Sequence, residues 1–466
     1  MNTATEKFFP FHQKMKDEGM PEIAIRTFEH YYRRLTEGSD GFIREDCIAP
    51  VESLPDLESL PARLAESGQR AVHETVIIKL NGGLGTGMGL NGPKSLLKVK
   101  SDLTFLDIIA RQALHERIPL LLMNSFATRD DTLAALARYP ELDRGIPLDF
   151  LQHKVPKVNV SDLGPASWPD NPALEWCPPG HGDIYTSMLT RGVLDLLLEK
   201  GYRYAFVSNS DNLGAVMNRV ILGYFAENRI PFLMEVAART EEDRKGGHLA
   251  MRRDGTLILR ESAQCAPTDL PMFQDIARHR YFNTNSLWIN LPALKELLES
   301  RENVLELPLI RNQKTIDPRD QSSTPVYQLE TAMGAAISLF KGSKALKVPR
   351  TRFLPVKTTN DLFAIYSDAY VLSNDCRVVL SPDKESGGSP MSISLDPEYY
   401  RHIDQLEERF PYGPPSLIEC EGVTIKGDIR FGRNVVFKYA VELINDTDAQ
   451  LEIDDGKVID GLRRFS

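Results

Sequence analysis

The C-terminal segment, residues 398–466, carries apolar residues with a period of six. One register holds Leu417, Val423, Ile429, Val435, Val441, Ile453 and Ile459, and is broken only by Thr447. A second apolar set, Ile425, Phe431, Phe437 and Leu443, follows two residues later. An α-helix would spread these positions around its circumference, and a single strand would alternate throughout. A β-helix with one hexapeptide on each face buries both sets, so we predict a β-helical domain, with a set of hairpins as the alternative.

Upstream of this repeat, β-rich runs alternate with helical patterns. The strand patterns are Val76–Leu80, Pro119–Met123, Leu148–Gln152, Tyr204–Ser208 and Tyr281–Ile289, and the helical patterns are Phe105–His115, Thr132–Arg138, Ile184–Leu198, Leu294–Glu299 and Leu329–Phe340. Such alternation predicts an α/β fold with a mixed, mainly parallel sheet covered by helices on both faces. Asp254-Gly255, inside Leu249–Arg260, predicts a tight hairpin because glycine accepts a positive φ.

The same pass along the chain predicts its domains. Residues 12–36 have the spacing of an amphipathic helix, within an N-terminal helical arm at 1–70. We expect the α/β domain at 71–382, and a linker at 383–397, which is rich in Ser, Gly and Pro. The β-helical domain then occupies 398–466. A chain of 466 residues is long enough for two or three such domains.

Charge and cysteine content exclude several classes of function. The formal net charge is -10, so a nucleic acid backbone would be repelled, and we expect no nucleic acid partner. The five cysteines are scattered without a C-x-x-C pair, which indicates neither a disulfide framework nor a zinc site. No apolar run reaches the ~18–20 residues of a membrane span. We therefore expect a cytoplasmic protein with no membrane partner.

A glycine-rich loop follows the first strand pattern. Residues 81–95 hold six glycines and run from Asn81 to Ser95 through Lys94. Glycines let the backbone approach a ligand and expose N–H groups that bind anions, so we predict a phosphate ligand. Two known patterns nearly match. The G-x-G-x-x-G run at 87–92 lies seven residues past the strand, too far for a dinucleotide-binding turn. Pro93 interrupts the P-loop pattern and removes a backbone N–H.

Asp211 comes just after the strand pattern Tyr204–Ser208. The C-terminal ends of strands are where open α/β sheets bind ligands, and a carboxylate there can hold Mg²⁺. Magnesium needs only one or two carboxylates besides substrate phosphates, so a single aspartate suffices. The alternative is a turn or helix cap before a helix over Val216–Phe225.

Six strings resemble eukaryotic-type UDP-glucose pyrophosphorylases, in the same order. They are LNGGLGTGMGLNGPKS from Leu80, MNSF from Met123, PPGHGDIY from Pro178, VSNSDNLGA from Val207, FNTNSLW from Phe282 and FLPVKTT from Phe353. The resemblance runs from about residue 20 to the C-terminus. It implies a Rossmann-like, glycosyltransferase-A-like nucleotidyltransferase domain and a C-terminal left-handed β-helix. It also implies a Mg-dependent, reversible reaction in which UTP and glucose 1-phosphate give UDP-glucose and pyrophosphate.

The resemblance also implies site residues. Lys94 matches the loop lysine that reaches the UTP phosphates, and Lys357 the second essential lysine, near the α-phosphate. UTP is expected to contact Leu80, Asn81, Gly82, Gly83, Lys94, Gln152, Gly180, Asn209 and Lys357. The sugar phosphate is expected to contact His181, Asn209, Gly246, Gly247, Glu261, Asn283 and Asn285. Asn and Gln side chains supply both a donor and an acceptor, which suits uracil and sugar hydroxyls.

This sequence departs from the family pattern at Gly87, where serine is usual, and at Ser210, where a larger apolar residue is common. Neither change removes a charged ligand. The loop begins Leu80-Asn81-Gly82-Gly83, which argues against relatives that use N-acetylhexosamine phosphates. Another hexose 1-phosphate remains the alternative substrate, and a catalytically silent scaffold or a dehydrogenase the alternative class. Relatives differ in assembly, and a homo-oligomer through the C-terminal domain is possible.

Overall fold

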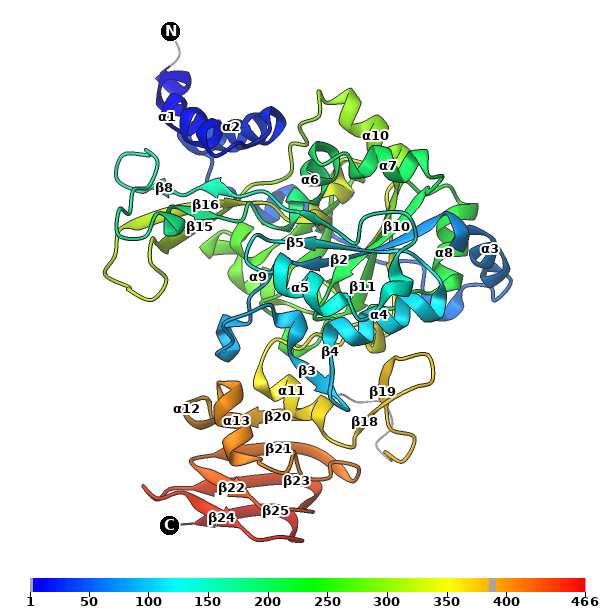
Figure 1. The fold of residues 1–466 in the computed structure, drawn as a ribbon, viewed down its shortest axis with the longest axis vertical. Coiled ribbons are helices and arrows are strands. Elements are labelled where there is room, and N and C mark those ends of the chain that lie inside the picture. Colours follow the sequence, from blue (N-terminus) through cyan, green and yellow to red (C-terminus); the bar gives the residue numbers. More distant parts are fainter. Residues whose placement is uncertain (1–2, 385–390, 466) are drawn as a thin grey trace.

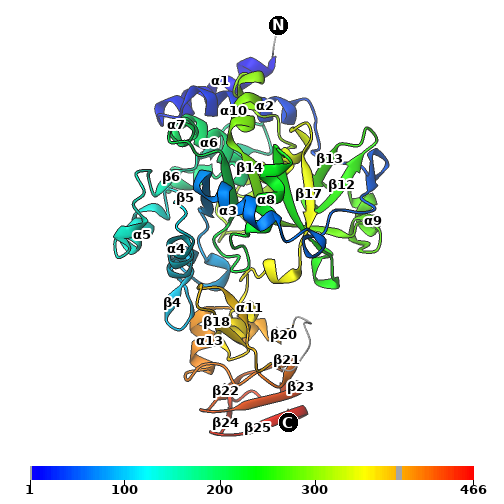
Figure 2. The same ribbon diagram turned by 90° about the vertical axis from the view of Figure 1, so that its right-hand side faces the viewer.

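The computed structural model describes residues 3–384 and 391–465. Figure 1 shows three regions along the long axis: two helices at the N-terminal end, a central α/β region, and a stack of strands at the C-terminal end. The same order is visible in the perpendicular view of Figure 2. No helix in the described ranges is long and apolar enough to cross a membrane.

The N-terminal arm consists of α1 (Thr3–Asp17) and α2 (Glu22–Thr36). The single helix expected over 12–36 is therefore broken, at Gly19, where φ is +73°. The aromatic rings of Phe11 and Tyr32 lie 4.8 Å apart between the two helices, and both side chains are fully buried. Burial of these rings attaches the arm to the central region.

Ten strands form the central sheet. They are β1 (Ile48–Pro50), β2 (Thr75–Asn81), β5 (Leu120–Asn124), β6 (Asp149–Leu151), β10 (Tyr204–Asn209), β11 (Phe232–Ala238), β12 (His248–Arg252), β13 (Leu257–Arg260), β14 (Tyr281–Asn290) and β17 (Lys344–Lys347). The run β10-β2-β5-β6 is parallel, as predicted. β14 pairs antiparallel with β10 and β11, so the sheet is mixed. The hairpin of β12 and β13 turns at Gly255, with φ +86°, which confirms that prediction.

Helices cover both faces of this sheet. One face carries α6 (Ile184–Thr190), α7 (Val193–Glu199) and α10 (Leu291–Ser300), and the other carries α3 (Leu64–Ala71), α4 (Phe105–Glu116) and α8 (Arg219–Glu227). A further helix, α5 (Arg129–Leu136), packs beside α4. The helix expected over Ile184–Leu198 is two helices, because Gly192 adopts a left-handed φ of +69° between them. The helix expected over Val216–Phe225 begins later, at Arg219, where Asn218 caps it.

Smaller elements surround the sheet. They are β3 (Lys98–Lys100), β4 (Leu103–Thr104), β7 (Val155–Pro156), β8 (Val158–Asn159), β9 (Trp176–Cys177), β15 (Ile310–Thr315), β16 (Pro325–Glu330), β18 (Tyr370–Leu372), β19 (Val378–Leu380), α9 (Leu270–Gln274) and α11 (Thr359–Tyr366). The predicted helix Leu329–Phe340 is wrong. β16 ends at Glu330 after pairing antiparallel with β15, and only a 3₁₀ helix, Met333–Ser338, follows.

The C-terminal region consists mainly of parallel strands. β20 (Ser392–Leu395), β21 (Cys420–Lys426), β23 (Val436–Asn445) and β25 (Val458–Phe465) form one sheet, and β22 (Ile429–Phe431) and β24 (Leu451–Ile453) another. Two short helices, α12 (Pro397–Tyr400) and α13 (Ile403–Arg409), lie beside them. Members of both apolar sets are buried, for example Val423 and Ile425. The expected linker falls partly on 385–390, outside the described residues, and β20 occupies its later part.

Candidate active site

The glycine-rich loop starts at the C-terminal end of β2, beside the ends of β5 and β10. Its Gly82 lies against Gln152: a Cβ atom there would be 2.8 Å from Gln152 Nε2. The Gln152 backbone N–H donates to the Asn124 carbonyl, and Ser125 Oγ donates to the Gly82 carbonyl. Two predicted base-reading elements, far apart in sequence, are thereby brought together.

Leu80, Asn81 and Asn209 lie where the parallel strands end. Leu80 is opposite Asn209 in the β2–β10 register, and its carbonyl accepts from the Ser210 N–H. The Asn81 amide is buried and donates to Asn124 Oδ1 at 2.8 Å and Thr132 Oγ1 at 3.0 Å. The Asn81 side chain is thus bonded to β5 and α5 and does not point toward a ligand through a free amide.

Lys94 and Asp211 form the central charged pair. Lys94 Nζ donates to Asp211 Oδ2 at 2.7 Å, across 117 positions of sequence. The other oxygen, Asp211 Oδ1, is buried and has no hydrogen-bond partner among the described residues. A buried carboxylate oxygen without a partner is costly, and its donor chemistry suits a hard cation. These residues therefore fit Mg²⁺. The described residues contain no group of three or more His, Cys, Asp or Glu arranged for a metal.

Residues 209–216, here named the Asp211 loop, are hydrogen-bonded to residues 352–357, here named the Lys357 segment. The Val356 N–H donates to the Asp211 carbonyl at 3.0 Å, and the Leu213 N–H to the Leu354 carbonyl at 3.1 Å. Asn212 adds its side chain: Oδ1 accepts from the Leu354 N–H, and Nδ2 donates to the Arg352 carbonyl. Backbone pairing thus makes the proposed metal ligand and the second lysine parts of one unit.

The sugar-side cluster comprises Gly246, Gly247, Glu261, Asn283 and Asn285. A Cβ at Gly247 would lie 2.4 Å from Glu261 Oε2. The Asn283 N–H donates to the Gly247 carbonyl, and Asn283 Nδ2 donates to Asn285 Oδ1 at 2.9 Å. Asn285 adopts a left-handed φ of +55°, which turns its side chain back toward Asn283. The five residues of the sugar-side cluster, which come from separate parts of the sequence, therefore lie next to one another.

Glu261 also connects the cluster to the Lys357 segment. Desolvation raises the pKa of Glu261, and the charge of Lys357 opposes that rise. Lys357 and Gly246 line one cavity of about 900 Å³, together with Leu213 and Phe282. The second lysine thus faces the same space as Gly246, the first residue of the sugar-side cluster.

Gly180 and His181 reach the site from the turn before α6. Their neighbour is the segment 331–334: the Gly182 N–H donates to the Thr331 carbonyl, and the Met333 N–H donates to His181 Nδ1 at 3.0 Å. Desolvation lowers the pKa of His181 to about 4. The ring is therefore neutral near pH 7 and carries its proton on Nε2, where it can donate to a ligand.

Sequence reasoning overlooked two elements of this site. One is Asn212, whose amide connects the Asp211 loop to the Lys357 segment. The other is the segment 331–334, which contacts His181 through Met333 and approaches Asn283 through Gly334, whose Cβ would lie 3.3 Å from Asn283 Nδ2. The only sequence signal for the second was a glycine inside the run that was expected to be helical.

Comparisons with known proteins identify relatives of this chain. A family described as UTP–glucose-1-phosphate uridylyltransferase matches residues 25–438. A curated protein of that name from Solanum tuberosum is 39% identical over 422 residues, covering 89% of this chain and 85% of the relative. The crystal structure of a UDP-glucose pyrophosphorylase variant from Leishmania major, in complex with UDP-glucose, superimposes with a TM-score of 0.92 at 42% identity, covering 99% of this chain and 100% of that one. A Trypanosoma brucei structure, described as UDP-glucose phosphorylase, gives 0.90 at 45% identity, covering 99% and 100%.

Proposed function

Because the chain belongs to the UTP–glucose-1-phosphate uridylyltransferase family, we propose that the Lys94–Asp211 pair and the Lys357 segment are its catalytic centre. The enzyme is a nucleotidyltransferase that forms UDP-glucose from UTP and glucose 1-phosphate. An oxygen of the sugar phosphate attacks the α-phosphorus of UTP, the bond to the β-phosphate oxygen breaks, and pyrophosphate leaves. The same groups serve the reverse direction.

The main physical obstacle is charge. Two unit charges about 4 Å apart cost about 4 kcal/mol at an effective dielectric of 20, and both substrates carry several. In the proposed site Lys94 binds the β- and γ-phosphates, and glycine-loop N–H groups bind phosphate oxygens. Lys357 stabilises the charge on the α-phosphate as the new bond forms. Catalysis is then mostly positioning and charge stabilisation.

Magnesium is the proposed cofactor, with Asp211 as its protein ligand. The supporting observation is the buried Asp211 Oδ1, which lacks a hydrogen-bond partner in the described part of the chain. The bound cation would supply charge neutralisation for the phosphates. Since Lys94 bonds the other oxygen of the same carboxylate, the lysine is already placed beside the phosphates that such a cation binds.

The remaining residues select the substrates. Gln152, with the backbone from Leu80 to Gly83 and at Gly180, reads uracil through donors and acceptors on its edge. Asn209 contacts both substrates from the end of β10. His181 donates from Nε2 to the sugar phosphate, while Glu261, Asn283 and Asn285 bind hydroxyls with backbone approach at Gly246 and Gly247. Another hexose 1-phosphate is the alternative acceptor.

Other features extend the proposal. The parallel C-terminal strands with two buried apolar sets support a left-handed β-helix at 398–466, and β20 adds a strand to its sheet from within the linker predicted at 383–397. The catalytic domain proposed at 71–382 also takes in β1, which pairs with β12 and lies within the segment 1–70 predicted as a helical arm. Association of two copies through the C-terminal domain, and a cytoplasmic location, belong to the same proposal.

The observation behind this assignment is that Asp211 is bonded both to Lys94 and to the Lys357 segment. A turnover assay tests the assignment. UTP and glucose 1-phosphate should give pyrophosphate with Mg²⁺ present and none after chelation. Lys357→Ala should lower kcat about a hundredfold or more, the effect of removing one preorganised donor. Galactose 1-phosphate as competitor identifies the sugar preference. Equal rates for the wild-type protein and the Lys357→Ala variant would exclude Lys357 from the mechanism.

A further inference from the structure

Lys79 is a buried amine that lies between the apolar residues Ile78 and Leu80 in β2. Its side chain in β2 is only 3% exposed, and Nζ donates to Ser208 Oγ at 2.7 Å and to the Ala215 carbonyl at 2.8 Å. Burial, the largest effect, lowers the pKa of Lys79 to about 7. An amine with a lowered pKa makes a folded protein less stable below its usual pKa, because the unfolded chain binds the proton more tightly. Stability therefore gives no reason for a lysine here.

Arg352 is a second buried cation at the same place. Its Nη2 donates to the Val216 carbonyl at 2.9 Å, next to the carbonyl that Lys79 binds. Arg352 is itself fixed by Glu235, whose carboxylate accepts from Nε at 2.6 Å and Nη2 at 2.8 Å. Trp288 Nε1 completes the set by donating to Glu235 at 2.9 Å. The carbonyls of Ala215 and Val216, at the end of the Asp211 loop, thus accept hydrogen bonds from Lys79 in β2 and from Arg352 in the Lys357 segment.

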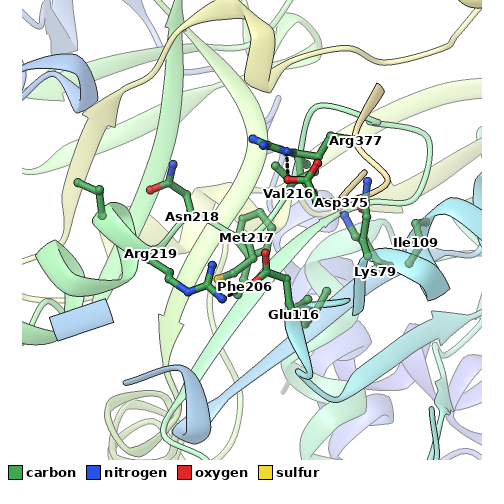
Figure 3. Close-up of a pocket in the computed structure, with 14 residues that line it drawn as sticks. Lys79, Ile109, Glu116, Phe206, Val216, Met217, Asn218, Arg219, Asp375 and Arg377 are labelled. Carbon is green, nitrogen blue, oxygen red and sulfur yellow. Dashed lines mark hydrogen bonds and ion pairs between the residues drawn. The ribbon is translucent and has the colours of Figure 1, made fainter. Parts of the chain in front are cut away.

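A cavity next to Lys79 shows why such bonds are needed. It has a volume of about 220 Å³ and is lined by Lys79, Phe206, Ala215 and Val216, among others. Figure 3 shows Lys79 at one side of this space and the Asp375–Arg377 ion pair near Val216. Close packing normally fixes a buried loop, and an open space removes those contacts on one side. Here the hydrogen bond from Lys79 takes their place.

We infer that Lys79 and Arg352 are positioning residues, which fix the carbonyls of Ala215 and Val216 and thereby the direction of the Asp211 carboxylate. Lys79 and Arg352 also fix the position of the Lys357 segment, because its backbone is bonded to the Asp211 loop and Arg352 is its first residue. This inference rests on the proposed roles of Asp211 and Lys357. Both residues are proposed to act through the backbone carbonyls that they bind. Their effect on turnover arises because displacements of about 1 Å lower rates by about a hundredfold.

Lys79→Met tests the inference, with Lys157→Met as a matched control. Lys157 is also a buried lysine, 4% exposed, and its Nζ donates to a carbonyl, that of Ile316 at 2.8 Å, remote from the site. Methionine is an unbranched side chain one heavy atom shorter than lysine, and it removes the hydrogen bonds. We expect Lys79→Met to lower kcat about tenfold to a hundredfold and to raise the half-saturating Mg²⁺ concentration several-fold, with both KM values within about threefold. The control should leave all four quantities unchanged.

Three results would overturn the inference. They are unchanged kcat and Mg²⁺ requirement in Lys79→Met, equal losses in both methionine variants, and a loss confined to KM. Asp211→Asn, measured alongside, separates the premises. If it leaves the Mg²⁺ requirement unaltered, the proposed metal role of Asp211 fails, and kcat of Lys79→Met alone decides the inference.

Ser208→Ala covers the case in which Lys79→Met does not fold. It removes one of the two acceptors of Lys79 and retains the lysine and its bond to Ala215. The expected changes have the same direction and are about threefold in size. An alanine variant that folds normally and keeps wild-type kcat and Mg²⁺ dependence would refute the positioning role.

Discussion

On the nucleotide side of the proposed site, the glycine-rich loop leaves Gly83, Leu84 and Gly87 exposed, whereas on the sugar side Gly247 and Asn283 are buried. The sugar-side groups already bond to one another, through Asn283 and Asn285. The nucleotide side instead holds its cation in an ion pair with Asp211, which UTP has to replace. The sugar side is therefore preformed, and we expect the nucleotide side to rearrange when its ligand binds.

This difference has a physical origin in the two ligands. A triphosphate brings charge, and a flexible lysine can move toward it with little loss of packing. A neutral sugar ring offers only hydroxyls, and preorganised donors and acceptors bind these at the least entropic cost. Substitutions should therefore act differently on the two sides, in an order that tests the comparison.

The largest effect is expected for Lys94→Met. This substitution removes the cation that neutralises the charge of the UTP phosphates, so kcat/KM for UTP should fall about a hundredfold or more. KM for glucose 1-phosphate should stay within about threefold of the wild-type value. Steady-state kinetics with each substrate varied in turn measures both. Lys98→Met is the control, since Lys98 is an exposed lysine paired with Asp102 at 3.0 Å. Equal losses toward both substrates would contradict a division of the site into two sides.

An intermediate effect is expected from Gly247→Ala and Gly82→Ala. The new Cβ would lie 2.4 Å from Glu261 Oε2 in the first and 2.8 Å from Gln152 Nε2 in the second. In Gly247→Ala, on the preformed sugar side, the clash should raise KM for glucose 1-phosphate about tenfold, which corresponds to about 1.4 kcal/mol of binding free energy. On the mobile side Gln152 can shift, so KM for UTP should rise only about threefold.

Gly92→Ala is the control for these two variants, because a Cβ there meets nothing within 4 Å. It should have wild-type values of both constants. Two results would contradict a more adaptable nucleotide side. One is a larger rise in KM from Gly82→Ala than from Gly247→Ala. The other is a rise in KM for glucose 1-phosphate in Gly82→Ala and for UTP in Gly247→Ala.

The smallest effect concerns the stability of the protein at acid pH. The pKa of His181 is lowered to about 4 from 6.5, so between these values the unfolded chain binds a proton that the folded protein does not. The free energy of unfolding should therefore rise with pH across this window. His181→Gln should reduce that rise, measured by urea unfolding at several pH values, whereas replacement of exposed His73 should not. An unaltered slope would mean that His181 is protonated in the folded protein.

The sequence allowed much of the fold to be predicted, because strand and helix periodicity reports burial directly. β2, β10 and the β12–β13 hairpin were found in this way. The run Leu329–Phe340 misled the prediction, since its apolar spacing suits an α-helix, whereas its first two residues pair with β15 and only the 3₁₀ helix Met333–Ser338 follows. Gly19 and Gly192 divide the other misjudged helices, because a left-handed φ ends a helix that its side chains would allow.

Site residues were predicted by type and position. The structure places several of them in contact, namely Gly82 with Gln152, Lys94 with Asp211, and Gly247 with Glu261. What sequence could not supply were residues that act through others. Asn212, Lys79 and Arg352 each donate to a backbone carbonyl of a segment that is distant in sequence, and such contacts leave no local pattern. A lysine within the apolar strand at 75–81 was the one visible sign.

The ion pair between Lys94 and Asp211 has a consequence for how the enzyme encounters metals. A carboxylate that is already neutralised by an ammonium group attracts a free divalent ion weakly. With Asp211 as the proposed metal ligand, selection among the cations of the cell would act on the nucleotide complex that arrives, rather than on ions bound beforehand. We then expect the enzyme without substrate to bind transition metals weakly, because Lys94 stays paired with Asp211 until a triphosphate displaces it.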